Sequence, residues 1–162
     1  MVLDTSAIVA AITNEPDGAR LQEAILGAAS LVISSVTVLE TRIVLQSRHG
    51  AEAVREFDEM LKNAGVVIVP FDAEMAETAF QAFRRYGKGQ GHPAQLNIID
   101  CAAYALAKSR ARPCCSRVAI SREPMSSRRS RDAVDGLSPA ARHSAPVISH
   151  QGDARWTFDA ST

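Results

Sequence analysis

The chain has 162 residues, with 18 Lys and Arg against 18 Asp and Glu. This length suffices for one well-packed domain but hardly for two. A formal net charge of zero argues against a broadly basic surface, so any contact with nucleic acid must be local. No run approaches the roughly 18 consecutive apolar residues of a membrane span, and no basic segment precedes an apolar one at the N-terminus. We therefore expect a cytoplasmic protein without membrane contact.

The predicted elements alternate between short apolar strands and helices. In chain order we expect a strand over 1–3, helices over 5–12 and 19–29, a strand over 31–33, helices over 35–45 and 51–63, a buried strand over 66–69, a helix from Asp72 to Tyr86, and a helix over 96–107. His49-Gly50 breaks the third and fourth helices apart, and a glycine-rich loop occupies 87–93. This order predicts an α/β fold in three layers, with a short parallel sheet between helices.

Cysteine and histidine do not form a metal-binding pattern. Cys101 lies in a helical stretch, whereas Cys114 and Cys115 are adjacent and match neither a zinc spacing nor a disulfide framework. The histidines lack the HExxH spacing. These spacings argue against a zinc hydrolase.

Three carboxylates, by contrast, stand in mostly apolar stretches. Asp4 directly follows the first strand, at the edge where open α/β sheets bind ligands, and Glu40 and Asp100 lie in helices with one buried face. Each has a purely structural interpretation as well. Asp4 could cap its helix, Asp100 could complete a capping arrangement with Asn97, and Glu40 could pair with Arg42 or Arg48. Together, however, three acids from separate segments could converge on a hard divalent cation such as Mg²⁺ or Mn²⁺.

The surrounding residues resemble the PIN-domain ribonucleases of the VapC toxin type. The matching segments are Val-Leu-Asp-Thr-Ser-Ala at 2–7, 35–40, Arg-Arg-Tyr-Gly-Lys-Gly at 84–89 with His-Pro at 92–93, Leu-Asn-Ile-Ile-Asp-Cys at 96–101, and 104–108. The resemblance covers about the first two thirds of the chain. A lone Asp-Thr-Ser would be a weak signal, but the combined order and spacing are specific.

This resemblance implies a PIN-like fold and a metal-dependent endoribonuclease, the toxin of a type II toxin–antitoxin system. It implies Mg²⁺ or Mn²⁺ as cofactor, with Asp4 and Asp100 as direct ligands and Glu40 binding directly or through water. It also implies an RNA substrate, a cognate VapB-type antitoxin and a homodimer. The candidate substrate contacts are Thr5, Ser6, Arg84, Arg85 and Lys88, although the three cations could instead form a solvated helix end.

After Lys108 the chain departs from this family. A PIN toxin should continue with an apolar strand and a fourth acid, but residues 113–162 contain seven Arg, no Lys, nine Ser and four Pro, a composition poorly suited to a core. We predict a domain at 1–112 and an irregular tail at 113–162 without a core strand. When the possible codons of Cys114 to Ser126 are read one base out of frame, they can encode the family segment that is missing here. This indicates a slip of the reading frame near Ala107 to Ser109.

Two alternative functions follow from the same residues. A catalytically inactive PIN remnant would retain only antitoxin binding or dimerisation. A phosphatase with an aspartyl nucleophile at Asp4 would ordinarily place a second acid two residues later, where this chain has Ser6.

Overall fold

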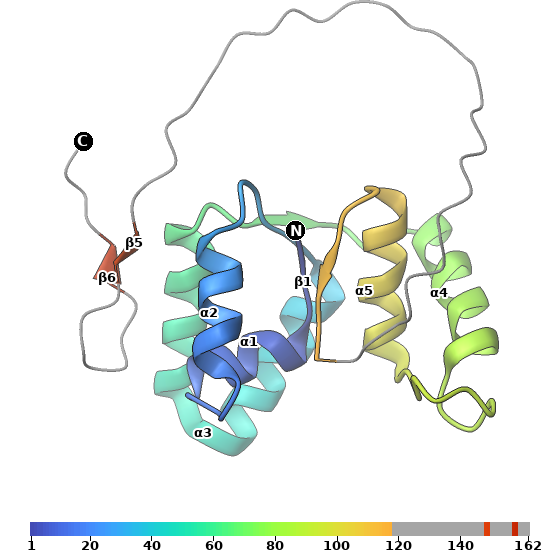
Figure 1. Cartoon of the computed structure of the whole chain (residues 1–162), viewed down its shortest axis with the longest axis horizontal. Helices are drawn as coiled ribbons and strands as arrows, with labels where there is room; N and C mark the ends of the chain where they lie inside the picture. Colours follow the sequence, from blue (N-terminus) through green and yellow to red (C-terminus); the bar gives the residue numbers. More distant parts are fainter. Residues whose placement is uncertain (118–147, 150–156, 159–162) are drawn as a thin grey trace, which may run out of the picture.

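A four-stranded parallel sheet forms the centre of the fold (Figure 1). The computed structural model describes residues 1–117, 148–149 and 157–158. The strands lie in the order β3-β2-β1-β4 and are β1 (Val2–Leu3), β2 (Val32–Ser34), β3 (Val67–Val69) and β4 (Cys114–Cys115). The helices are α1 (Thr5–Ile12), α2 (Gly18–Leu26), α3 (Ser35–Asn63), α4 (Ala73–Tyr86) and α5 (Ile98–Ser109). Two further strands, β5 (Ile148–Ser149) and β6 (Thr157–Phe158), pair with each other in antiparallel fashion.

The sheet separates two apolar cores, because neighbouring side chains on a strand point to opposite faces. Leu3 and Ile33 pack with α1, α2 and α3 on one face. Val2 and Val32, which are paired in register, pack with α4 and α5 on the other face. Figure 1 shows these two helical layers on either side of β1. The predicted three-layer α/β arrangement is therefore confirmed.

Helix α3 consists of two halves that meet at Gly50. This residue has φ 82° and ψ −175°, a conformation that glycine adopts without the steric cost of a Cβ atom. The break expected at His49-Gly50 is thus confirmed. Arg42 in the first half pairs with Asp58 in the second at 2.9 Å, so the two halves are also joined by an exposed ion pair.

The structure corrects two expectations about strands. The third strand is not fully buried: Val67 and Ile68 are 58% and 48% exposed, because β3 lies at the edge of the sheet. A strand also follows α5, where the sequence predicted none. Cys114 and Cys115 pair in parallel with Val2 and Leu3, so β4 lies beyond the predicted boundary at residue 112.

Beyond residue 117 only β5 and β6 fall within the described part of the chain. The prediction of an irregular tail therefore lies mostly outside the described residues. Within them, no helix is both long and apolar enough to cross a membrane.

Two phenylalanines provide a matched test of this packing. Phe57 is fully buried in the core on the α3 face, whereas Phe80 on α4 is 55% exposed. We expect Phe57→Ala to lower the free energy of unfolding by about 3–5 kcal/mol, because it removes a large buried side chain and leaves a cavity. Phe80→Ala should change it by less than about 1 kcal/mol. Urea unfolding followed by circular dichroism measures both, and equal losses would contradict this assignment of the core.

Candidate active site

Asp4 stands at the carboxyl end of β1, between two neighbouring strands. Its side chain is 1% exposed. One oxygen, Oδ2, accepts hydrogen bonds from Ser6 Oγ at 2.7 Å and from Ser116 Oγ at 3.0 Å. The other, Oδ1, is buried and has no hydrogen-bond partner among the described residues. Asp4 occupies the N-cap position of α1 but its side chain makes no capping bond, so the capping interpretation is wrong.

Glu40 lies in the second turn of α3 and is partly buried. Burial raises the pKa of its carboxyl, a side-chain hydrogen bond with Thr5 lowers it, and the charge of Asp4 raises it. The alternative ion pair of Glu40 with Arg42 or Arg48 is not found among the described residues, and Arg42 contacts Asp58 instead. Glu40 is therefore oriented toward Thr5 and the Asp4 charge.

Asp100 lies in the first turn of α5, where it serves as a cap. The Asn97 side chain accepts hydrogen bonds from the backbone N–H groups of Ile99 and Asp100, at 2.7 and 2.9 Å. In return, Asp100 Oδ2 accepts from the Asn97 backbone N–H at 2.7 Å. This is the capping arrangement considered from the sequence, and it is confirmed. It fixes the direction in which the Asp100 carboxylate points.

The three acids act on one another electrostatically. Burial raises the pKa of Asp100 to about 6, the backbone hydrogen bond from Asn97 opposes this shift, and the charges of Asp4 and Glu40 add to it. Since such interactions require proximity, the three carboxylates lie near enough for each to feel the charge of another. Their joint role at a cation site stays a prediction.

The donor set of this region suits a hard cation. It offers carboxylate oxygens. One of them, Asp4 Oδ1, is buried without a hydrogen-bond partner among the described residues, whereas buried polar atoms ordinarily have one. Within the described part of the chain, no three His, Cys, Asp or Glu side chains are grouped closely enough to enclose an ion.

The candidate substrate contacts lie in two places. Thr5 is buried and its hydroxyl faces Glu40 and Thr41, whereas Ser6 is partly buried beside Asp4. The cations are exposed: Arg84 and Arg85 lie in the last turn of α4, and Lys88 follows in the loop.

This loop is held beside the start of α5. The Lys88 backbone N–H donates to the Leu96 carbonyl at 2.9 Å, and Leu96 immediately precedes the Asn97 cap. His92 packs edge-on against Tyr86, with ring centroids 4.9 Å apart, which agrees with a structural role for this histidine. A role of Arg84, Arg85 and Lys88 in RNA binding stays a prediction.

Two residues near the acids were missed by sequence reasoning. Ser116 belongs to the stretch assigned to the tail, yet it donates to Asp4. Thr41 is fully buried and its hydroxyl lies 3.2 Å from that of Thr5. The spacing of Thr37, Thr41 and Leu45 along one buried face of α3 is a signal that could have drawn attention to Thr41.

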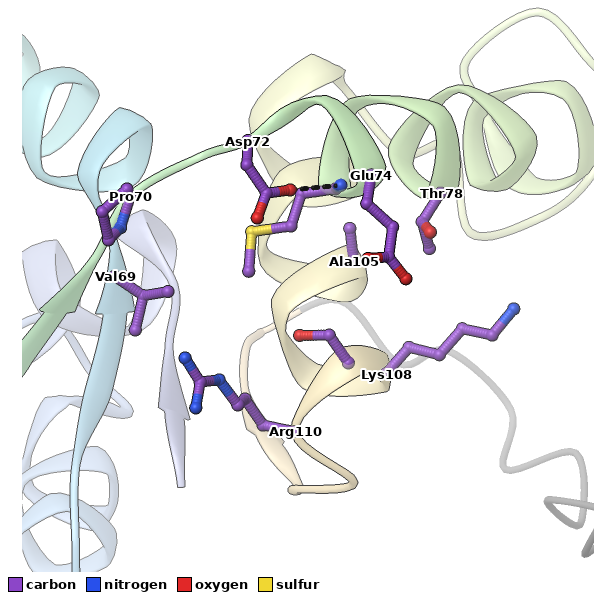
Figure 2. A pocket seen from close by; sticks show the side chains of 10 residues that line it. Val69, Pro70, Asp72, Glu74, Thr78, Ala105, Lys108 and Arg110 are labelled. Atoms are coloured by element: carbon purple, nitrogen blue, oxygen red, sulfur yellow. Dashed lines mark hydrogen bonds between the residues drawn. The ribbon is translucent and has the colours of Figure 1, made fainter. Parts of the chain in front are cut away.

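A hollow of about 530 Å³ lies between the start of α4 and the end of α5 and does not include the three acids. Figure 2 shows it with Asp72 and Glu74 on one side and Lys108 and Arg110 on the other. The Asp72 carboxylate is used as the cap of α4, where it accepts from the Met75 backbone N–H at 2.8 Å. The hollow is therefore separate from the carboxylate region.

Comparison with known proteins agrees with this fold. Two solved structures share the fold at low identity. The Mycobacterium tuberculosis toxin VapC20 has a TM-score of 0.56 at 15% identity, covering 68% of this chain and 83% of its own. A toxin–antitoxin complex from Klebsiella pneumoniae has a TM-score of 0.52 at 16% identity, covering 70% and 82%.

The sequence comparisons are closer. Residues 1–116 match the PIN domain family. A Ribonuclease VapC from Mycolicibacterium smegmatis is 47% identical over 113 residues, covering 70% of this chain and 87% of the relative. Ribonuclease VapC30 from Mycobacterium tuberculosis is 42% identical over 113 residues, covering 70% and 86%. The chain belongs to the VapC ribonuclease family of PIN-domain proteins.

Proposed function

We propose that this chain is a metal-dependent endoribonuclease, the toxin of a type II toxin–antitoxin system, with Asp4, Glu40 and Asp100 as its active-site acids. The observation that carries the proposal is the convergence of these acids: burial raises the pKa of Asp100 to about 6, and the charges of Asp4 and Glu40 add to that shift. Such a cluster repels an RNA phosphate, so the phosphodiester bond can approach only when a cation is present. The curated relatives are named as ribonucleases, in agreement with this chemistry.

Each acid has its own support. Ser6 and Ser116 orient Asp4 Oδ2 and leave Oδ1 for a ligand. The cap of α5 holds Asp100, and Thr5 holds Glu40. Asp4 and Asp100 would bind Mg²⁺ or Mn²⁺, with Glu40 completing the site directly or through water. When bound, the cation supplies a water of lowered pKa and neutralises charge on the phosphate.

The substrate and partner follow from the family. One structural neighbour is described as a toxin that cleaves the sarcin–ricin loop, and another is a toxin–antitoxin complex. We infer an RNA substrate and a cognate VapB-type antitoxin for this chain, a homodimeric state and a cytoplasmic location.

The inactive-remnant alternative is not favoured. The three acids, their hydrogen bonds and β4 are all in place within the described residues. The fourth acid that the family resemblance implies has no counterpart among the described residues after α5, and the predicted frame slip would account for its absence there.

RNA cleavage tests the assignment of the acids. With Mn²⁺ or Mg²⁺ present, we expect the purified chain to cut RNA, and Asp4→Asn and Asp100→Asn to reduce the rate at least 100-fold, because each removes charge from the cation site. Asp58→Asn is the matched control, since Asp58 pairs with Arg42 at the surface. A chain with the reading frame restored after Lys108 runs in parallel. Cleavage that survives Asp4→Asn would overturn the proposal, and cleavage by the restored chain alone would favour the remnant.

Thermal unfolding gives a test that is independent of RNA. In a chelator at pH 7, we expect Asp100→Asn to unfold at a higher temperature than the unaltered chain. The change removes a partly buried charge and its repulsion by Asp4 and Glu40, while an amide oxygen preserves the cap. With Mn²⁺ at about 100 times its Kd, the unaltered chain should gain roughly 2.7 kcal/mol of stability, and the variant much less. The difference between the two unfolding temperatures would then shrink or change sign. A variant that gains as much as the unaltered chain would show that Asp100 does not hold the ion.

The role of the exposed cations is tested by steady-state kinetics. We expect Arg84→Ala and Lys88→Ala to raise KM severalfold with little change in kcat, because a phosphate contact remote from the scissile bond contributes uniform binding. The effect should shrink as salt concentration rises. Arg55→Ala is the control, because Arg55 pairs with Glu52 on the exposed side of α3. Unchanged KM in both variants would assign these cations to a solvated helix end.

A further inference from the structure

Four hydroxyl side chains are buried where α1 and α3 meet the ends of β1 and β2. They are Thr5, Ser34, Thr37 and Thr41, with exposed fractions of 8%, 0%, 0% and 0%. A buried hydroxyl without a hydrogen bond destabilises a fold. The hydroxyl oxygens of Ser34 and Thr37 have no hydrogen-bond partner among the described residues, whereas those of Thr5 and Thr41 contact each other.

Thr41 differs from Thr37, which lies one helical turn earlier on the same face. The Thr41 hydroxyl lies 2.8 Å from the Thr37 carbonyl, the usual local partner of a threonine inside a helix. It also lies 3.2 Å from the Thr5 hydroxyl, on a different element and 36 residues away in the chain. The local bond alone would satisfy Thr41, so the contact with Thr5 is additional.

Thr5 connects this pair to the acids. It directly follows Asp4, and its side chain is near enough to Glu40 to lower the pKa of that carboxyl by hydrogen bonding. A threonine hydroxyl has one proton to donate and two lone pairs that accept. When Thr5 donates to Glu40, its oxygen is left as an acceptor for Thr41, whose proton is shared between Thr5 and the Thr37 carbonyl in a three-centre bond.

We propose that Thr41 is a positioning residue of the nuclease, which orients the Thr5 hydroxyl toward Glu40 and so fixes the third acid of the cation site. This inference rests on the proposed function. Glu40 and Thr41 are neighbours on α3 and therefore point in different directions. Their connection runs through Thr5 on α1, so the orientation of Glu40 depends on the packing of α1 against α3.

The test measures Mn²⁺ affinity by calorimetry and RNA cleavage for four full-length chains: unaltered, Thr41→Val, Thr41→Ser and Thr37→Val. Valine has nearly the shape of threonine but no hydroxyl. We expect Thr41→Val to weaken Mn²⁺ binding about tenfold and to lower kcat, as is typical when a group behind a metal ligand is lost. Thr41→Ser should restore both. Thr37→Val is the matched control, because it changes an equally buried hydroxyl of the same helix whose oxygen has no partner.

The outcomes separate the two proposals. Weaker binding in Thr41→Val alone, with unfolding temperatures close to that of the unaltered chain, supports the positioning role. Equal losses in Thr41→Val and Thr37→Val would reduce Thr41 to a packing role and overturn the inference. Normal Mn²⁺ binding and cleavage by Thr41→Val would overturn it as well and leave the proposed function standing. An unaltered chain that neither binds Mn²⁺ nor cuts RNA would overturn both.

Discussion

Strand β1 is paired on both edges and buried on both faces, and the arrangement of the other elements depends on this position. Val2 and Leu3 are fully buried and face opposite cores. On one side β1 pairs with β2, and on the other with β4. Because the chain must leave this buried strand at its carboxyl end, Asp4 emerges there with almost no exposure to solvent. The fold thus imposes burial on a charged side chain, and the neighbouring structure has to compensate for it.

The compensation is uneven between the two oxygens of Asp4. Two serine hydroxyls bond to Oδ2, and none of the described residues bonds to Oδ1. Asp100 likewise combines a hydrogen bond with an electrostatic effect. Asp100 uses one oxygen to cap α5 while its charge adds to the cluster. A carboxylate that caps a helix is held in a fixed direction at little conformational cost. The structural interpretation of Asp100 is confirmed, and it is compatible with the predicted role of Asp100 as a metal ligand.

Strand β4 shows how far the family-like part of the chain extends. Its two cysteines occupy the position of a core strand, and Cys115 packs into the core on the α1, α2 and α3 face. Burial raises the pKa of the Cys114 thiol to about 12, so it behaves as a small neutral apolar group. Cysteine can therefore stand where larger apolar residues are usual. Ser116 and Arg117 then attach the end of this segment to Asp4 and to the Glu15–Asp17 turn.

Most elements of the fold, and the three acids as candidates for the site, could be predicted from the sequence because they depend on local patterns. Apolar runs indicated the strands, the break at Gly50 and the caps Asp72 and Asn97 set helix ends, and the three acids stood out in apolar surroundings. Tertiary structure alone decided which side chains meet. The bonds from Ser116 to Asp4 and from Thr41 to Thr5 span 112 and 36 residues. Edge exposure of β3 and the pairing of β4 likewise depend on strand order, which no local pattern encodes.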